Sequence, residues 1–231
     1  MDNNDLILKN RLLLWDIDGT LVRTNRPNSS NPHLNTLLKF GYSVSTDLPE
    51  LSGCTDYEVI IELLKKAKIS VNKFTLRKIF REIDKEAHQL DKISEFKLCS
   101  GVQNILDTLN TKKWTHGILT GNTNSRMISK LLSSNILDYF LKDLMFSCNF
   151  GESREDISKN ARIKIKKEVY QKIYMIGDTP KDIFAARSAG FPIISVASGS
   201  YSLLDLSHHN PDLLIQNLEV DSNLLIDYLS K

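Results

Sequence analysis

Two aspartates directly follow an apolar run near the start of the chain. The run is Leu12–Trp15, and the segment Asp-Ile-Asp-Gly-Thr then places carboxylates at Asp16 and Asp18. Side chains two residues apart on an extended strand point the same way, so both carboxylates face one side. Carboxylates this close repel each other unless a cation neutralises them, and hard divalent cations prefer oxygen ligands. The segment therefore predicts a metal site with a carboxylate available as nucleophile.

Polar residues also follow two later apolar runs. They are Thr120, Gly121 and Asn122 after 117–119, and Asp178 and Asp182 after 173–176. Ligands of an open parallel sheet bind outside the carboxyl ends of its strands, so these residues are expected at one site. Taken alone, Asp182 has a plainer interpretation, because it lies three residues after Thr179 in the pattern of a helix capping box. Several aspartates after separate apolar runs favour a shared site, since unpaired carboxylates repel.

The order of the apolar runs predicts the elements that position these residues. Strand-like runs lie at 12–15, 117–119, 144–146, 173–176, 193–196 and 213–215, and helical patterns lie between most of them, for example at 102–109, 126–132 and 183–189. This alternation predicts an α/β fold, a Rossmann-like doubly wound parallel sheet with helices on both faces. Residues 25–98 show helical periodicity and no convincing strand. We therefore expect an α/β core formed by residues 1–24 and 99–231, with a helical cap domain formed by 25–98.

Composition excludes several classes of function. The chain has 231 residues, and its net charge of +2 gives no electrostatic case for nucleic acid binding. Its apolar runs are too short for a membrane span. The cysteines, Cys54, Cys99 and Cys148, are far apart and form no CxxC pair, which supports neither a disulfide framework nor structural zinc. We expect a cytoplasmic monomer or dimer that acts on a small molecule.

Three motifs resemble those of the haloacid dehalogenase (HAD)-like hydrolase superfamily. They are Asp-Ile-Asp-Gly-Thr-Leu-Val at 16–22, Ile-Leu-Thr-Gly-Asn at 118–122 and Ile-Gly-Asp-Thr-Pro-Lys-Asp at 176–182, in the family's order. The helical insertion is similar to the family's first type of cap (C1), and Leu51–Asp56 resembles the cap loop of phosphoglycolate-phosphatase-like members. The resemblance implies a Mg²⁺-dependent phosphatase that hydrolyses a small phosphate monoester through an aspartyl-phosphate intermediate.

The resemblance also implies the roles of the acidic residues. Asp16 would attack phosphorus, and Asp18 would protonate the leaving group and then activate water. Asp16, the backbone carbonyl of Asp18, and Asp178 would hold Mg²⁺, with Asp182 in support. An unperturbed aspartate has a pKa of about 3.9, so Asp16 is expected to be ionised at neutral pH. A nearby phosphate and a second carboxylate would favour the protonated form of Asp18.

A further group of residues is expected to bind substrate. Thr120, also counted as catalytic, and the amide of Gly121 would bind phosphate oxygens; the other candidates are Asn122, Gly53, Thr55 and Asp56. For Thr55 or Asp56, a helix N-cap ahead of Glu58 is at least as good an interpretation.

The third family motif departs from the usual pattern. It commonly carries a lysine before a proline, whereas the corresponding stretch here is Gly151–Asp156, without proline. Arg154 is the first candidate for the missing cation, and Lys159 is the second. An arginine would offer a planar fork in place of a point charge. The plainer interpretation places both on the surface.

Other functions are possible on the same scaffold. A phosphomutase similar to β-phosphoglucomutase is the nearest alternative, and the cap sequence does not decide against it. Haloacid dehalogenases lack the second aspartate, so Asp18 argues against that reaction. A non-catalytic binding protein is the remaining alternative, but no catalytic aspartate is missing.

Overall fold

A six-stranded parallel sheet forms the centre of the computed structural model, which describes residues 11–26, 31–45, 51–165 and 169–231. Its strands, in spatial order, are β5 (Phe140–Phe146), β4 (Thr115–Leu119), β1 (Arg11–Trp15), β6 (Lys172–Gly177), β7 (Ile193–Val196) and β8 (Leu213–Ile215). Each neighbouring pair is parallel. Leu12–Trp15 of β1 are fully buried, which explains why this strand is continuously apolar instead of alternating.

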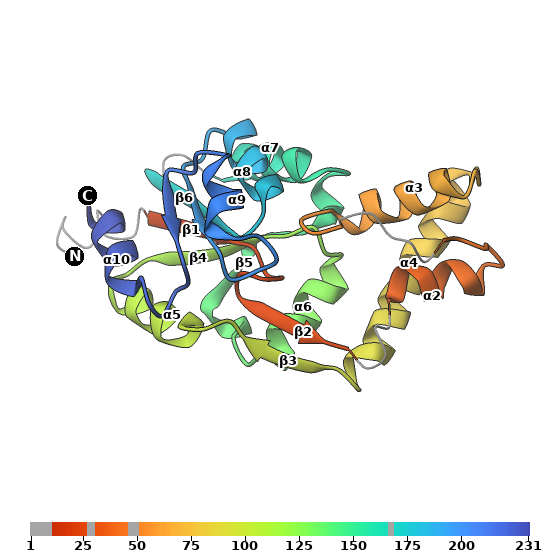
Figure 1. Cartoon of the computed structure of the whole chain (residues 1–231), viewed down its shortest axis with the longest axis horizontal. Coiled ribbons are helices and arrows are strands. Elements are labelled where there is room, and N and C mark those ends of the chain that lie inside the picture. Colours follow the sequence, from red (N-terminus) through yellow and green to blue (C-terminus); the bar gives the residue numbers. More distant parts are fainter. Residues whose placement is uncertain (1–10, 27–30, 46–50, 166–168) are drawn as a thin grey trace.

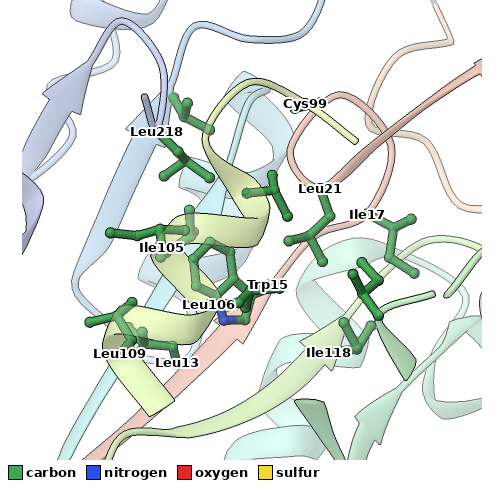
Figure 2. Packing of buried hydrophobic residues seen from close by; sticks show 14 of the residues in the cluster. Leu13, Trp15, Ile17, Leu21, Cys99, Ile105, Leu106, Leu109, Ile118 and Leu218 are labelled. Atoms are coloured by element: carbon green, nitrogen blue, oxygen red, sulfur yellow. The ribbon is translucent and has the colours of Figure 1, made fainter. Parts of the chain in front are cut away.

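Helices cover both faces of the sheet. One face carries α5 (Val102–Thr111), α6 (Asn124–Ser133) and α10 (Ser222–Ser230), and the other carries α7 (Arg154–Lys164), α8 (Pro180–Ser188) and α9 (Leu203–Ser207). Leu13 and Trp15 point to the first face, where Ile105, Leu106 and Leu109 of α5 pack against them (Figure 2). Leu12 and Leu14 point to the second face. The doubly wound α/β core is thus confirmed.

The order of the strands changes direction at β1, and a site can form at the strand ends there. From β1 the chain moves outward to β4 and β5, then returns to β6 on the other side of β1 and continues to β7 and β8. Such a reversal opens a crevice at the carboxyl ends of the central strands. The polar residues that follow β1, β4 and β6 therefore meet at one edge of the sheet.

Local sequence explains where the helices around this crevice begin. Thr123, Ser153 and Thr179 are the N-cap residues of α6, α7 and α8, and each side chain accepts a hydrogen bond from a backbone N–H of the first turn. Such caps satisfy donors that the helix itself leaves unpaired. In α7 and α8 the bond is completed as a capping box, and α8 starts with Pro180.

The segment expected to form the cap joins the rest of the chain through a two-stranded antiparallel ribbon, and we keep the name cap for residues 25–98. Its strands are β2 (Val22–Asn25) and β3 (Glu95–Leu98), with Val22 paired to Leu98. The prediction that 25–98 holds no strand was wrong at β3. Its four residues alternate between exposed and half-buried, unlike the fully apolar runs that indicated the sheet strands.

Helices make up the rest of the cap in the described ranges. They are α2 (Pro32–Lys39), α3 (Asp56–Lys66) and α4 (Lys73–Asp91), and they share a separate apolar cluster that includes Leu37, Ile60 and Ile83. In Figure 1 these helices stand at one end of the molecule and α10 lies at the other. Short 3₁₀ turns at Leu137–Tyr139 (η2) and Cys148–Phe150 (η3) flank β5. None of the helices in the described part of the chain has the length and apolarity needed to cross a bilayer.

Candidate active site

Three buried carboxylates meet where β1 and β6 end. Asp16, Asp178 and Asp182 each offer an oxygen, and these oxygens all lie within 4.8 Å of one another. Asp16 is 1% exposed, Asp178 2% and Asp182 0%. Like charges this close and this dry are costly without a compensating cation. The aspartates predicted to converge from distant parts of the chain therefore do so.

Glycines leave room for the carboxylate of Asp178. A Cβ atom added to Gly199 would lie 1.7 Å from Oδ2 of Asp178, and one added to Gly19 would lie 2.3 Å from the same oxygen. Gly19 also has a φ of +85°, a conformation that disfavours other residues. The hydroxyl of Thr20 donates a hydrogen bond to Oδ1 of Asp178 at 2.8 Å. Oδ2 of Asp178 therefore lies against Gly19 and Gly199, where any larger residue would collide with it.

Asp16 has an oxygen to spare for a ligand. Among the described residues, its buried Oδ2 finds no hydrogen-bond partner. Burial raises the pKa of Asp16 to about 7, although the positive charge of Arg154 opposes the shift. Burial, followed by the charge of Asp16, raises the pKa of Asp178 well above its usual range. The expected ionisation of Asp16 assumed an unperturbed pKa, and burial shifts that pKa upward.

These observations fit a hard divalent cation. An orphaned carboxylate oxygen and a glycine-lined carboxylate are oxygen donors of the kind that Mg²⁺ prefers. A cation beside them would stabilise their ionised forms and remove the cost of burying like charges. Asp16 and Asp178 could therefore hold the ion.

Arg154 supplies the cation nearest to Asp16. Its Nη2 lies 3.0 Å from Oδ1 of Asp16, and its Nη1 lies 2.7 Å from Oδ1 of Asp182. The Arg154 side chain is 4% exposed. Lys159 is exposed on the same helix, α7. The geometry therefore favours Arg154 over Lys159 as the equivalent of the missing lysine.

Asp182 both completes the capping box of α8 and lies in the carboxylate cluster. Its Oδ2 accepts hydrogen bonds from the backbone N–H and the hydroxyl of Thr179, which completes the capping box of α8. Its Oδ1 accepts from Arg154. Both oxygens are used by the protein, so Asp182 orients Arg154 and adds negative charge near the site.

Asp18 lies at the mouth of the site and is held by a lysine from α6. Lys130 Nζ donates to Oδ1 at 2.6 Å and to Oδ2 at 2.5 Å, and Asn122 Nδ2 donates to Oδ2 at 2.8 Å. The Asp18 side chain is 47% exposed, whereas Lys130 is 3% exposed. Desolvation of the carboxylate raises the pKa of Asp18. The charge and hydrogen bonds of Lys130 outweigh this effect and lower the pKa to about 2. Asp18 is therefore held as a carboxylate here.

Thr120 and its neighbours follow β4 as predicted. Thr120 is fully buried, and its Oγ1 accepts a hydrogen bond from Asn122 Nδ2 at 2.8 Å. Gly121 lies under the cap, because a Cβ atom there would be 2.6 Å from the carbonyl oxygen of Cys54. The carbonyl of Gly121 accepts from the backbone N–H of Asp56 at 2.8 Å. The end of β4 is thus in direct contact with the cap loop.

The cap loop 51–56 closes over the site. The carbonyl of Gly53 accepts a hydrogen bond from Nε of Arg154 at 3.1 Å. Thr55 caps α3 in a capping box with Glu58, as its plainer interpretation predicted, and its hydroxyl donates to the carbonyl of Glu152 at 2.6 Å. The polar atoms of Thr55 are therefore engaged by the protein, while Gly53 lines the cavity.

Asp56 joins the cap to the core. Its carboxylate accepts from Arg126 Nη1, from the backbone N–H of Thr123 at 2.7 Å, and pairs with Nε2 of His33 at 2.8 Å. Burial raises the pKa of Asp56, but Arg126 and the hydrogen bond from His33 outweigh it, so the pKa lies well below its usual value. We call Asp56, Arg126, His33 and Thr123 the seam cluster. Contact of Asp56 with substrate stays a prediction.

Sequence reasoning missed Lys130, Arg126 and His33. Arg126 and Lys130 are spaced four residues apart on α6, beside the buried Met127 and Leu131. That spacing places both cations on one helix face next to the apolar stripe, which is the signal that could have identified them. His33 follows Asn31, the N-cap of α2, and carries no motif.

A cavity of about 560 Å³ lies between cap and core over these residues. Its lining includes Asp16, Asp18, Asp178 and Arg154 from the core and Gly53 and Asp56 from the cap loop. Gly121 and Asn122 also line it. The cavity therefore joins the carboxylate cluster, the end of β4 and the cap loop in one space.

Comparison with solved structures shows the same fold. CbbY from Rhodobacter sphaeroides, solved in complex with phosphate, is 16% identical with a TM-score of 0.68, covering 91% of this chain and 96% of its own. A protein provisionally assigned as a β-phosphoglucomutase from Bacteroides vulgatus is 17% identical with a TM-score of 0.69, covering 98% and 94%. A predicted phosphoglycolate phosphatase from Haemophilus somnus 129pt is 17% identical with a TM-score of 0.66, covering 95% and 98%.

Sequence comparison identifies the family. No curated protein matches the chain at a significant level. The sequence profile of the haloacid dehalogenase-like hydrolases matches residues 13–196, which span the motifs, the cap and the carboxylate cluster. The chain therefore belongs to the haloacid dehalogenase-like hydrolase family.

Proposed function

We propose that this protein is a Mg²⁺-dependent phosphatase that hydrolyses a phosphate monoester of a small metabolite through an aspartyl phosphate on Asp16. The observation that carries the proposal is the buried cluster of Asp16, Asp178 and Asp182, with Arg154 3.0 Å from Asp16. Family membership and the likeness to CbbY, which was solved with phosphate, support it.

Asp16 is the proposed nucleophile. Its free Oδ2 can attack phosphorus, while Oδ1 is oriented by Arg154. Attack forms an O–P bond to Asp16 as the bond from phosphorus to the alcohol oxygen breaks, and a water molecule later hydrolyses the aspartyl phosphate. Arg154 would also stabilise the negative charge on the transferred group.

Mg²⁺, held by Asp16, Asp178 and the carbonyl of Asp18, would neutralise phosphate charge and align the attack. Asp182 supports this arrangement through Arg154. The ionised Asp16 that the attack requires depends on the positive charge supplied at this site, since burial otherwise raises its pKa.

Asp18 is the proposed proton carrier. Lys130 and Asn122 hold it as a carboxylate, which is the form needed to take a proton from the hydrolytic water. In the first step, Asp18 has to exchange its contacts with Lys130 for one with the substrate and take up a proton. The singly protonated form of the phosphate ester can supply that proton, which Asp18 then passes to the leaving alcohol oxygen. Lys130 is therefore a positioning residue in this scheme.

Thr120 and the amide of Gly121 are proposed to bind phosphate oxygens. Thr120 Oγ1 accepts from Asn122 and, within the described part of the chain, donates to no other group. Its proton remains available for a phosphate oxygen. Asn122, Gly53, Thr55 and Asp56 are proposed to shape the substrate site, with Thr55 and Asp56 acting through the position of the cap.

The cap gives the site a way to exclude water. Its loop is bonded to Arg154 through Gly53 and to Gly121 through Asp56. A closed cap would protect the phosphoryl transfer, and opening would admit water and release product.

The proposal is tested by phosphate release from an aryl phosphate, with Mg²⁺ and with a chelator. We expect release only with Mg²⁺, and we expect Asp16→Asn to abolish it while circular dichroism shows a folded protein. Trapping of phosphate on the peptide that contains Asp16, detected by mass spectrometry, would support the intermediate directly. Near-normal turnover by Asp16→Asn would overturn the assignment of the nucleophile.

The phosphomutase alternative shares the first step and differs in the fate of the phosphoryl group. A mutase returns it to a second hydroxyl of the substrate, whereas a phosphatase gives it to water. Product analysis with a sugar phosphate separates the two, because only a mutase yields an isomer without free phosphate.

We further propose that the protein works in the cytoplasm. Its three cysteines are free thiols, and Cys99 is buried. Unpaired cysteines are typical of a reducing compartment.

A further inference from the structure

We propose that the substrate carries a second anionic group, a carboxylate or another phosphate, which Arg23, Arg26 and Arg126 bind at the cap side of the cavity. The inference rests on the proposed phosphatase function and names the class of its substrate. It concerns residues that the catalytic scheme above does not use.

The cavity is lined by guanidinium groups outside the carboxylate cluster. Arg23 lies on β2, Arg26 directly follows that strand, and Arg126 lies on α6. They come from the ribbon that carries the cap and from the core helix beneath it. Arginine presents several N–H donors in a plane and is well suited to carboxylates and phosphates.

Arg23 has no acidic partner. Its guanidinium donates to the carbonyl of Ser198, with Nε at 3.1 Å, and also interacts with the thiol of Cys99. Arg23 lines the cavity and is an exposed residue. Because its contacts are neutral groups, its positive charge is not compensated by a carboxylate and can attract an anion.

Arg126 is a buried cation and Arg26 a half-buried one, and each has a donor to spare. The Nε atoms of both are buried and have no hydrogen-bond partner among the residues described. Arg26 reaches Asp91 only at 3.4 Å, and Asp91 also accepts from Ser129. Buried donors without partners are uncommon and point to a missing acceptor.

The guanidinium groups of Arg26 and Arg126 also repel each other. Burial, and then the charge of Arg126, lowers the pKa of Arg26. Asp56 offsets the charge of Arg126, but it is already shared with His33 and Thr123. An anion between the arginines would relieve this repulsion, whereas a neutral alcohol would leave it in place.

The volume of the cavity permits such a substrate. About 560 Å³ is in the range of small-molecule sites and exceeds what a phosphoryl group alone needs. One end of the ligand can lie at Asp16 while the other contacts the arginines.

Matched pairs of phosphate esters test the inference. 3-Phosphoglycerate carries a carboxylate where glycerol 3-phosphate carries a CH₂OH group. 6-Phosphogluconate and sorbitol 6-phosphate differ in the same way, with a longer carbon chain between that group and the phosphate. We expect kcat/KM to be at least about tenfold higher for the carboxylate member of one pair, as hydrogen bonds between charged groups predict. The pair that shows the preference indicates the distance between the two anionic groups.

The variant Arg23→Gln examines the recognition itself. Arg23 makes no ion pair among the described residues, so the fold is expected to tolerate the change. It should reduce the preference for the carboxylate substrate by about tenfold. Lys97→Gln is the control. Lys97 lies opposite Arg23 in the register of the ribbon, and its side chain is 68% exposed. It does not line this cavity. The control removes the same charge and should keep the wild-type preference.

Inhibition of aryl phosphate hydrolysis keeps the test independent of turnover. Each ester is added as a competitor, and the carboxylate member should inhibit at about tenfold lower concentration. Equal kcat/KM and equal inhibition within both pairs, with aryl phosphate hydrolysed normally, would overturn the inference and leave the phosphatase function standing. Absence of Mg²⁺-dependent hydrolysis of every ester would instead overturn the proposed function, and the inference with it.

Discussion

Two clusters of buried charges line the same cavity, and only in one of them does the central carboxylate have its full set of donors. We call that cluster complete and the other incomplete. In the seam cluster, the carboxylate of Asp56 receives donors from Arg126, His33 and Thr123. In the carboxylate cluster at the sheet edge, Asp16 and Asp182 share the guanidinium of Arg154, and Asp178 accepts from the hydroxyl of Thr20. Oδ2 of Asp16 has no partner in the described structure. The difference separates a contact between cap and core from the cluster that we propose binds a cation and a phosphate.

The physical contrast lies in how burial affects each cluster. Burial raises the pKa of Asp16 to about 7, so its ionised form is poorly supported. Asp56 is equally buried, but Arg126 and His33 hold its pKa well below the usual value. A buried carboxylate with its full set of donors stabilises a structure, while one without them marks a place for chemistry.

The largest effect is expected when the incomplete cluster loses Asp178, one of its proposed metal ligands. Asp178→Asn should lower phosphatase activity about a thousandfold, because the cation that stabilises transition-state charge would be lost. The free energy of unfolding should not fall, since the change removes one of three crowded carboxylates. Steady-state kinetics and urea unfolding measure the two effects. Asp143→Asn, on the exposed part of β5, is the control and should match the wild type. A fully active Asp178→Asn protein would contradict the comparison.

Removal of the single cation in that cluster comes next. Arg154→Ala should lower kcat about a hundredfold, because Asp16 and the transferred phosphoryl group lose their positive neighbour. Lys159→Ala, on the exposed side of the same helix, should change kcat little. Kinetics at saturating Mg²⁺ compare the two variants. The reverse ranking would move the third-motif role to Lys159.

The complete cluster is expected to respond in stability. Asp56→Asn should reduce the free energy of unfolding by about 3 kcal/mol, because a buried Arg126 would lose its charged partner. Denaturant unfolding of Asp56→Asn, Arg126→Gln and the double variant gives the coupling between the two residues. Additive losses would show that the seam cluster is not a unit.

A buried histidine in the sheet provides the smallest effect. His116 accepts a hydrogen bond from Nε1 of Trp15 on Nδ1, and burial lowers its pKa to about 4. The folded protein therefore holds this histidine neutral, while the unfolded chain takes up a proton below about pH 6.5. Stability should fall by about 2 kcal/mol between pH 6.5 and pH 5 through this group. His116→Asn should show a smaller fall over that range, measured by urea unfolding. An unchanged fall would assign the pH dependence elsewhere.

The parts that could be predicted from the sequence are those with local signals. Continuous apolar runs indicated the sheet strands, and the residues that follow β1, β4 and β6 indicated the site, because parallel strand ends meet at one edge. Thr179 and Asp182 indicated a capping box, which is present. These inferences need only neighbours in the chain and the topology of a parallel sheet.

The parts that could not be predicted depend on packing between distant segments. In the sequence, Lys130 has no feature that distinguishes it from other helix lysines. Its contact with Asp18 depends on how α6 packs in the folded protein. The pKa of Asp16 depends on burial, which its motif does not specify. The strand β3 is short, lies in a two-stranded ribbon and shares none of the apolar character of the sheet.

The most direct test of the comparison is a titration with Mn²⁺, used as a paramagnetic substitute for Mg²⁺ and followed by electron paramagnetic resonance. We predict one tightly bound ion per chain in the wild type and in Asp56→Asn, and loss of that ion in Asp178→Asn. If Asp178→Asn bound Mn²⁺ as tightly as the wild type, the carboxylate cluster at the sheet edge would not be the metal site, and the account would be contradicted.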